Sequence, residues 1–128
     1  MQGKRTVPGL GSLETVIMEA LWKTQEASVR DVLEAIGNGY AYTTVMTVMQ
    51  RLQEKGVLRR RLVDGAYLYQ AVAARDQYAK ETVQKMLDQL VDGFGDVALA
   101  QFLDTLDEVS PERLQRLRTK LQQEKRRK

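Results

Sequence analysis

Apolar side chains recur at helical spacing three times in the first half of the chain. The spacing is i, i+3, i+4 and i+7 or close to it, which places the apolar residues on one face of an amphipathic helix. The three stripes consist of Leu13, Val16, Ile17, Ala20 and Leu21; Val29, Val32, Leu33 and Ile36; and Val45, Val48, Met49 and Leu52. The pattern therefore predicts three short helices that share a core.

Capping residues delimit these helices. Ser12 precedes the first stripe and is expected as its N-cap, and Ser28 precedes the second with Asp31 three residues on, as in a capping box. The run 37–39, Gly-Asn-Gly, ends the second helix sharply, because these residues tolerate the left-handed conformation. Gly56 stands where the third helix needs its C-terminal cap. The segment 1–10, with Gly3, Pro8 and Gly9, is expected to be a mobile arm.

The spacing of apolar side chains changes from helical to strand-like after Gly56. Residues 57–63 and 66–72 are strand-like and flank Asp64-Gly65, a pair that favours a type I′ hairpin turn. A two-stranded ribbon is marginal by itself, so it must pack on the helices. Three helices followed by a hairpin predict a mainly α fold, a winged helix-turn-helix domain over residues 1–72.

Residues 73–128 carry further helical stripes. Ser110-Pro111 is expected to open the last helix, with Ser as N-cap and Pro at the first helical position. Three amphipathic helices of this length cannot bury their own apolar faces, so we expect a homodimer that joins here. The expected dimer contacts are Leu87, Leu90, Phe94, Phe102, Leu106, Leu114, Leu117 and Leu121.

The polar face of the third predicted helix is short of Glu and Lys. It carries hydroxyls, an amide and an arginine, which can enter a major groove and bond to base edges or phosphates. Arginines at the base of the hairpin alternate between its two faces, so about two of the three are expected on the DNA backbone. The candidate DNA-binding residues are Tyr42, Thr43, Thr44, Met46, Thr47, Gln50, Arg51, Arg59, Arg60 and Arg61.

Charge is concentrated in the same segment. Between Tyr40 and Leu62 there are five cations and one anion, a net charge of +4, whereas the whole chain of 128 residues has +3. A solvated helix face and a charged edge strand that blocks aggregation are the alternative interpretations. A second basic run at residues 125–128 suits the end of a solvated helix.

Composition excludes several kinds of site. The chain has no Cys and no His, so thiol chemistry, the commonest general base and the commonest metal ligands are missing. No Gly-rich phosphate loop or nucleophile motif occurs. We therefore expect no enzyme, no cofactor and no metal. Without a long apolar run or an apolar leader, we expect no membrane insertion and a cytoplasmic location.

The segment from Ala41 to Leu52, Ala-Tyr-Thr-Thr-Val-Met-Thr-Val-Met-Gln-Arg-Leu, resembles the BlaI/MecI family of penicillinase repressors. The likeness extends to the first predicted helix, to residues 28–32 (Ser-Val-Arg-Asp-Val) and to residues 55–58 (Lys-Gly-Val-Leu). In the first helix it rests on Leu13-Glu14, Val16, Met18 and Leu21-Trp22. It covers nearly the whole chain and is strongest up to Val72. The resemblance implies a homodimeric repressor that binds a palindromic operator in double-stranded DNA through its winged helix.

The resemblance also implies a release mechanism. In the family a membrane sensor protease leads to cleavage at an Asn-Phe pair; the comparable pair here is Gln101-Phe102, and the chain's single asparagine is Asn38. Related copper-responsive repressors use cysteines, which this chain lacks. Two other functions stay open from the residues alone: a winged-helix regulator that senses a small molecule through its C-terminal helices, and a winged-helix protein-interaction module.

Overall fold

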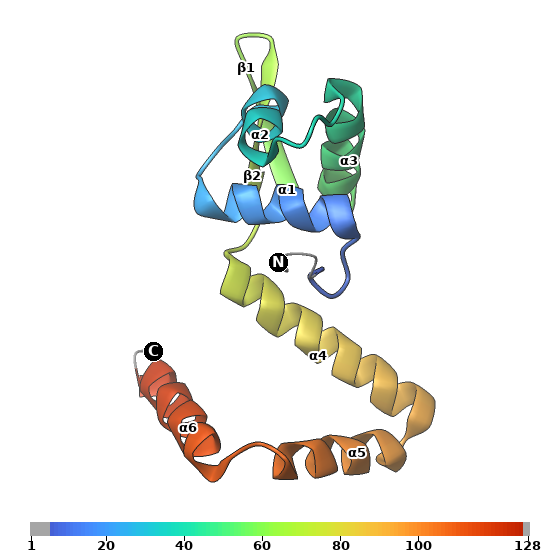
Figure 1. The fold of residues 1–128 in the computed structure, drawn as a ribbon, viewed down its shortest axis with the longest axis vertical. Helices are drawn as coiled ribbons and strands as arrows, with labels where there is room; N and C mark the ends of the chain where they lie inside the picture. The colour runs from blue at the N-terminus through green and yellow to red at the C-terminus, as the bar shows by residue number, and fades with distance from the viewer. Residues whose placement is uncertain (1–5, 127–128) are drawn as a thin grey trace. The chain divides into compact units, whose positions relative to one another are not determined.

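The computed structural model describes residues 6–126. It is mainly helical with one antiparallel hairpin (Figure 1), and it confirms the predicted winged-helix fold. The elements are α1 (Ser12–Lys23), α2 (Val29–Ile36), α3 (Tyr42–Glu54), β1 (Leu58–Val63), β2 (Ala66–Ala71), α4 (Arg75–Phe94), α5 (Asp96–Asp107) and α6 (Pro111–Arg126).

The hydrophobic core lies among α1, α2, α3 and the hairpin. Each predicted stripe supplies residues to it, and Leu58 of β1 and Tyr69 of β2 bring the hairpin into it. The buried apolar residues are Leu10, Ile17, Met18, Leu21, Ala27, Val29, Val32, Val45, Val48, Met49, Leu52, Leu58 and Tyr69. Burying one apolar face of each helix leaves the opposite faces to water or to a partner.

The helix caps follow the sequence with one exception. The capping box of α2 is confirmed: Ser28 Oγ accepts from Asp31 N, and Asp31 Oδ2 accepts from Ser28 N, both at 3.1 Å. Ser110 caps α6 as expected, since its Oγ accepts from Arg113 N at 3.2 Å. The expectation that Ser12 caps α1 is wrong. Gly11 is the N-cap, and its N–H donates to Glu14 Oε1 at 2.9 Å, so a glutamate of the first turn provides the cap.

The hairpin has the predicted turn, and its strands pair from Val63 with Ala66 to Leu58 with Ala71. Asp64 (φ 50°) and Gly65 (φ 82°) both lie in the left-handed region, as a type I′ turn requires. Ala27, between α1 and α2, forms an isolated antiparallel bridge with β2 that the sequence did not predict. It exchanges backbone hydrogen bonds of 3.0 and 2.8 Å with Tyr69, so the hairpin is held to the helices through its backbone as well as its side chains.

The expectation of a mobile arm is wrong for residues 7–10. Leu10 is buried, its N–H donates to the Val7 carbonyl at 2.9 Å, and Val7 N donates to Thr15 Oγ1 at 3.0 Å. The two apolar residues flank the Pro-Gly pair and hold this segment on α1. The free energy gained by burying their side chains exceeds the cost in conformational entropy of ordering the segment. The part of the expected arm in residues 1–5 lies outside the described residues.

The chain divides into two compact units, and the division falls between Val83 and Gln84, inside α4. The expected boundary between residues 72 and 73 stays a prediction about the extent of the DNA-binding domain. In the described parts of α4, α5 and α6 no residue is buried, unlike in α1 to α3. None of the helices formed by residues 6–126 is both long and apolar enough to cross a membrane.

Candidate nucleic-acid interface

Helix α3 is anchored on one side and open on the other. Its stripe of Val45, Val48, Met49 and Leu52 is buried against α1 and α2. The residues expected to meet DNA lie on the remaining surface: Tyr42, Thr43, Thr44, Thr47, Gln50 and Arg51 are exposed, and Met46 is half-buried against the core. The core thus fixes the rotation of α3 and directs its hydroxyls, amide and guanidinium outward.

The turn between α2 and α3 sets the start of this surface. Gly37, Asn38 and Gly39 all have positive φ, at 62°, 63° and 70°, which lets the chain reverse within a few residues. Ala41 then caps α3 without a side-chain hydrogen bond. The first N–H groups of α3 therefore remain available to a phosphate or to water.

Arg30 is a functional candidate that the sequence patterns did not indicate. It extends from the first turn of α2, and its guanidinium carbon lies 5.5 Å from the ring centroid of Tyr42 at the start of α3. A cation in the first turn opposes the helix dipole, so its position there costs stability. That unfavourable placement is the sequence signal by which Arg30 could have been found.

The three wing arginines have three different partners. Arg59 donates from Nε and Nη2 to Gln70 Oε1 at 3.2 and 3.1 Å. Arg60 lies on the other face of β1, with its guanidinium carbon 4.0 Å from the Tyr67 ring centroid and an Nη1 bond of 3.2 Å to the Tyr69 hydroxyl. The expected alternation along the strand is therefore present.

Arg61 is the wing arginine with an acidic partner. Its Nε and Nη2 donate to the two carboxylate oxygens of Glu26 at 2.7 and 2.8 Å. This hydrogen bond from Arg61 is the main cause that lowers the pKa of Glu26, and the same contact raises the pKa of Arg61. The charge of Arg61 is thus balanced within the fold.

A second ion pair joins α3 to α1. Lys55 Nζ lies 2.9 Å from Glu14 Oε2, at the C-terminal end of α3. Burial would raise the pKa of Glu14, but hydrogen bonds from Gly11 and Lys55 and the charges of Lys55 and Arg51 outweigh burial and lower it. Lys55 therefore contributes less positive charge to the surface than the sequence count suggests.

Four cations of α2, α3 and the wing form no ion pair within residues 6–126. They are Arg30, Arg51, Arg59 and Arg60. Arg51 comes from α3, Arg30 from α2, and Arg59 and Arg60 from the wing. Positive charge that is not neutralised within the protein suits phosphate oxygens, whereas the hydroxyls of α3 suit base edges.

The expected dimer contacts lie on the second half of α4 and on α5 and α6. Leu90, Phe94, Phe102, Leu117 and Leu121 are exposed, with 45–68% of their surface accessible, and Leu87, Leu106 and Leu114 are half-buried. Leu87, Leu90, Phe94 and Phe102 line one open apolar groove of about 460 Å³ between α4 and α5. Gln101, of the expected cleavage pair, lines the same groove, and the Gln101–Phe102 bond lies inside helix α5.

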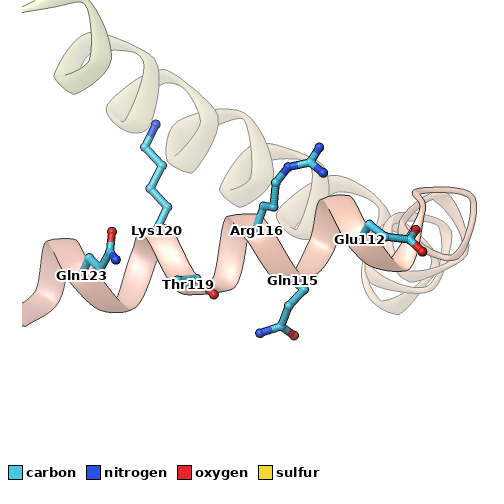
Figure 2. A pocket seen from close by; sticks show the side chains of 6 residues that line it. All are labelled: Glu112, Gln115, Arg116, Thr119, Lys120 and Gln123. Atoms are coloured by element: carbon cyan, nitrogen blue, oxygen red, sulfur yellow. The ribbon is translucent and has the colours of Figure 1, made fainter.

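Helix α6 has a polar face opposite its leucines. Figure 2 shows six polar side chains that line a shallow hollow along this one helix. They are Glu112, Gln115, Arg116, Thr119, Lys120 and Gln123. Because one helix supplies every lining residue, the hollow has no enclosing walls and no converging catalytic groups. Within residues 6–126, no cluster of three acidic side chains could hold a metal ion.

Comparison with known proteins identifies relatives over most of the chain. Residues 10–123 match the sequence profile of the penicillinase repressor family. The transcriptional regulator BlaI of Mycobacterium tuberculosis, in strains CDC 1551 and H37Rv, is 35% identical over 117 residues, which cover 88% of this chain and 85% of that protein.

Several solved structures also match, among them the following two. The DNA-binding domain of the repressor BlaI gives a TM-score of 0.49 at 20% identity, over 58% of this chain and 93% of that one. A MarR family protein from Bacillus stearothermophilus gives 0.48 at 15% identity, over 91% of this chain and 75% of that one.

Proposed function

The chain belongs to the penicillinase repressor family, and we propose that it acts as a homodimeric transcriptional repressor that binds a palindromic operator. A repressor of this kind is a DNA-binding protein and not an enzyme. In this proposal α3 lies in the major groove of double-stranded DNA, and the wing contacts the phosphate backbone. The observation that carries it is the open face of α3, where hydroxyls and Arg51 are exposed while the apolar stripe is buried.

The proposal divides the interface by chemistry. Tyr42 at the helix start, Arg51, Arg59 and Arg60 hold phosphates, because their groups are charged or can donate without regard to base identity. Thr43, Thr44, Thr47 and Gln50 read base edges, since a threonine methyl fits a thymine methyl and a glutamine amide can bond to adenine. Met46 packs beneath this surface and fixes how far α3 projects into the major groove.

Two single substitutions test this division on duplexes that the wild-type protein selects from a random-sequence pool. Replacing Arg51 with Ala should weaken binding to all duplexes alike and reduce the log–log salt slope by about 0.9 for each phosphate that the variant no longer neutralises. Replacing Thr47 with Ala should instead change which sequences are selected. Thr119 on α6 offers a matched control, since Thr119→Ala removes an exposed hydroxyl outside the proposed interface. If the Thr47→Ala, Arg51→Ala double variant binds the selected duplex as tightly as wild type, α3 does not contact DNA.

The dimer is proposed from the apolar faces of α4, α5 and α6. Large apolar side chains this exposed over three helices mark an interaction surface, and a second copy of the same surface covers it symmetrically. Leu117→Lys should therefore yield a monomer by sedimentation equilibrium and weaken operator binding through reduced avidity. Thr119→Lys adds the same charge on the polar face of the same helix and should leave the dimer intact (Figure 2). A monomeric wild-type chain at micromolar concentration would refute the dimer.

Release from DNA by proteolysis, as the resemblance implies, is proposed at the Gln101–Phe102 bond. Proteases bind an extended chain, whereas this bond is helical and both side chains line the α4–α5 groove. Cleavage therefore requires α5 to unfold locally, and it should be slower in the dimer than in the Leu117→Lys monomer. Mass spectrometry of the fragments formed with a membrane sensor protease would identify the bond. The cytoplasm is the proposed location, and cell fractionation tests it.

The α4–α5 groove also supports a second function, that of a small-molecule sensor. Its volume of about 460 Å³ and its apolar lining suit a drug-sized ligand. Thermal denaturation in the presence of a metabolite library tests this directly. A ligand should raise the melting temperature of the wild-type chain, and a Phe94→Ala variant should not show that response. The proposed DNA face of α3 is polar and basic rather than apolar, which disfavours a protein-interaction module.

A further inference from the structure

The start of α4 is attached to α1 by a cluster of side chains around the only tryptophan in the chain. The Trp22 indole Nε1 donates to the Ala73 carbonyl at 3.1 Å, just before α4 begins. The Tyr78 ring lies 5.5 Å from the Trp22 ring, centroid to centroid, at an interplanar angle of 48°. We call Glu19, Trp22, Ala73, Arg75 and Tyr78 the α1–α4 joint.

Arg75 adds a second type of contact to this joint. Its Nε and Nη2 donate to the two carboxylate oxygens of Glu19 at 3.0 and 3.2 Å, and its guanidinium carbon lies 5.8 Å from the Trp22 ring centroid. The hydrogen bond from Arg75 to Glu19 is the main cause that raises the pKa of Arg75. Backbone, ring and ion-pair contacts thus fix the first turns of α4 in both position and direction.

The joint lies at the edge of the winged helix rather than in its core. The side chains of Arg75 and Glu19 are 56% and 37% exposed, and ion pairs this exposed contribute little to stability. Trp22 and Tyr78 are only half-buried at the margin of the core. The direction of α4 is nevertheless consequential, because a helix of 20 residues is ~30 Å long and a tilt of ~10° at its base moves its far end by ~5 Å.

We propose that the α1–α4 joint sets the separation of half-sites that the dimer accepts on its operator, with Trp22, Arg75 and Tyr78 as positioning residues. The inference rests on the proposed function, since it needs two winged helices connected through α4 and the dimer region. A displacement of ~5 Å exceeds the ~3.4 Å rise of one base pair, so a fixed joint selects one spacing and a loose joint tolerates several.

The test uses the full-length chain and the selected duplexes described above. Binding is measured to a single half-site, to the full site, and to full sites with one or two base pairs inserted or removed between the half-sites. Arg75→Ala, Tyr78→Ala is the test variant. Gln77→Ala is the control, because it removes an exposed hydrogen bond to Glu81 (2.9 Å) on the same turns of α4 and lies outside the joint.

Wild type and Gln77→Ala should lose about ten-fold or more in affinity when two base pairs are inserted, because only one half-site can then be bound. The test variant should lose about three-fold or less, and its affinity for a single half-site should stay within about two-fold of wild type. A variant that keeps the wild-type spacing ratio overturns the inference. A variant that loses single half-site binding in parallel also overturns it, since the joint would then only support folding.

Trp22 provides a readout without DNA. As the single tryptophan, it should show a red-shifted emission in the test variant but not in Gln77→Ala. Amide exchange in residues 75–83 should accelerate in the same variant. A wild-type chain without spacing preference would refute the dimeric operator and this inference together. A sharp wild-type preference that the variant retains would refute the inference alone.

Discussion

Glu26 neutralises an arginine of the wing, and its removal should strengthen binding to DNA of any sequence. Glu26 holds Arg61 through two hydrogen bonds of 2.7 and 2.8 Å, so Arg61 contributes no net charge to the surface in the free protein. Glu26→Gln removes the negative charge and leaves a side chain of the same size. Arg61 then lacks an acidic partner, like Arg59 and Arg60, and we expect it to bind a phosphate.

The magnitude follows from counterion release. One additional phosphate contact per subunit makes the log–log salt slope steeper by about 0.9, which corresponds to roughly five-fold tighter binding per half-site at about 0.15 M salt. The assay is fluorescence anisotropy on a short duplex of unselected sequence, repeated at several salt concentrations. Arg61→Gln should change the slope little, whereas Arg59→Gln should flatten it by about 0.9.

Glu108→Gln is the control for net charge. It removes one negative charge at an exposed position that forms no ion pair in the described part of the chain. It should leave the salt slope unchanged. If Glu26→Gln binds no more tightly than wild type and has the same slope, Arg61 does not reach phosphate. If its binding is weaker, the ion pair positions the wing, and the reasoning from neutralised charge fails.

Three further predictions concern the fold. Leu52→Ala should lower the free energy of unfolding by about 2–5 kcal/mol in urea denaturation with an unchanged m-value, because Leu52 is fully buried; an effect below about 1 kcal/mol would contradict its place in the core. Gly65→Ala should cost about 1–2 kcal/mol in the same assay through its φ of 82° alone, since no atom lies within 4 Å of the added Cβ, and a neutral result would refute the turn. Because the pKa of Glu14 is lowered in the folded state, the Glu14 carboxylate stabilises the fold above its ordinary pKa of 4.5, and this contribution disappears as the pH falls through the folded value. Wild type should therefore lose stability below that pH more steeply than Lys55→Met, and parallel curves would exclude the ion pair.

The sequence predicted the winged helix in detail because the signals for it are local. Each signal depends on residues within one or two turns of each other. These signals are the spacing of apolar residues, the Ser28 capping box, the glycine after α3 and the Asp64-Gly65 turn. The same locality explains the failure at Ser12, where a serine and a neighbouring glycine compete for one cap. Glu14 decides between them by bonding to Gly11, and α3 fixes Glu14 through Lys55.

The partners of the charged residues could not be predicted, because they come from distant segments. Arg61 and Glu26 are 35 residues apart, and Arg75 and Glu19 are 56 apart. Composition shows a basic wing, but the tertiary structure decides which of its arginines has an acidic partner within the fold. Arg30 joins the candidate surface for the same reason, since only the turn at residues 37–39 brings it beside Tyr42.

The sequence by itself determined the order of helices and strands, the apolar stripe of α3 and the composition of its outward face, since side-chain period and turn chemistry are properties of short segments. Only the tertiary structure decided which cations of the candidate surface remain without an acidic partner, that Ala27 holds the wing, and that Trp22 attaches the start of α4. Those contacts form when folding brings together residues far apart in the chain, and no local pattern specifies them.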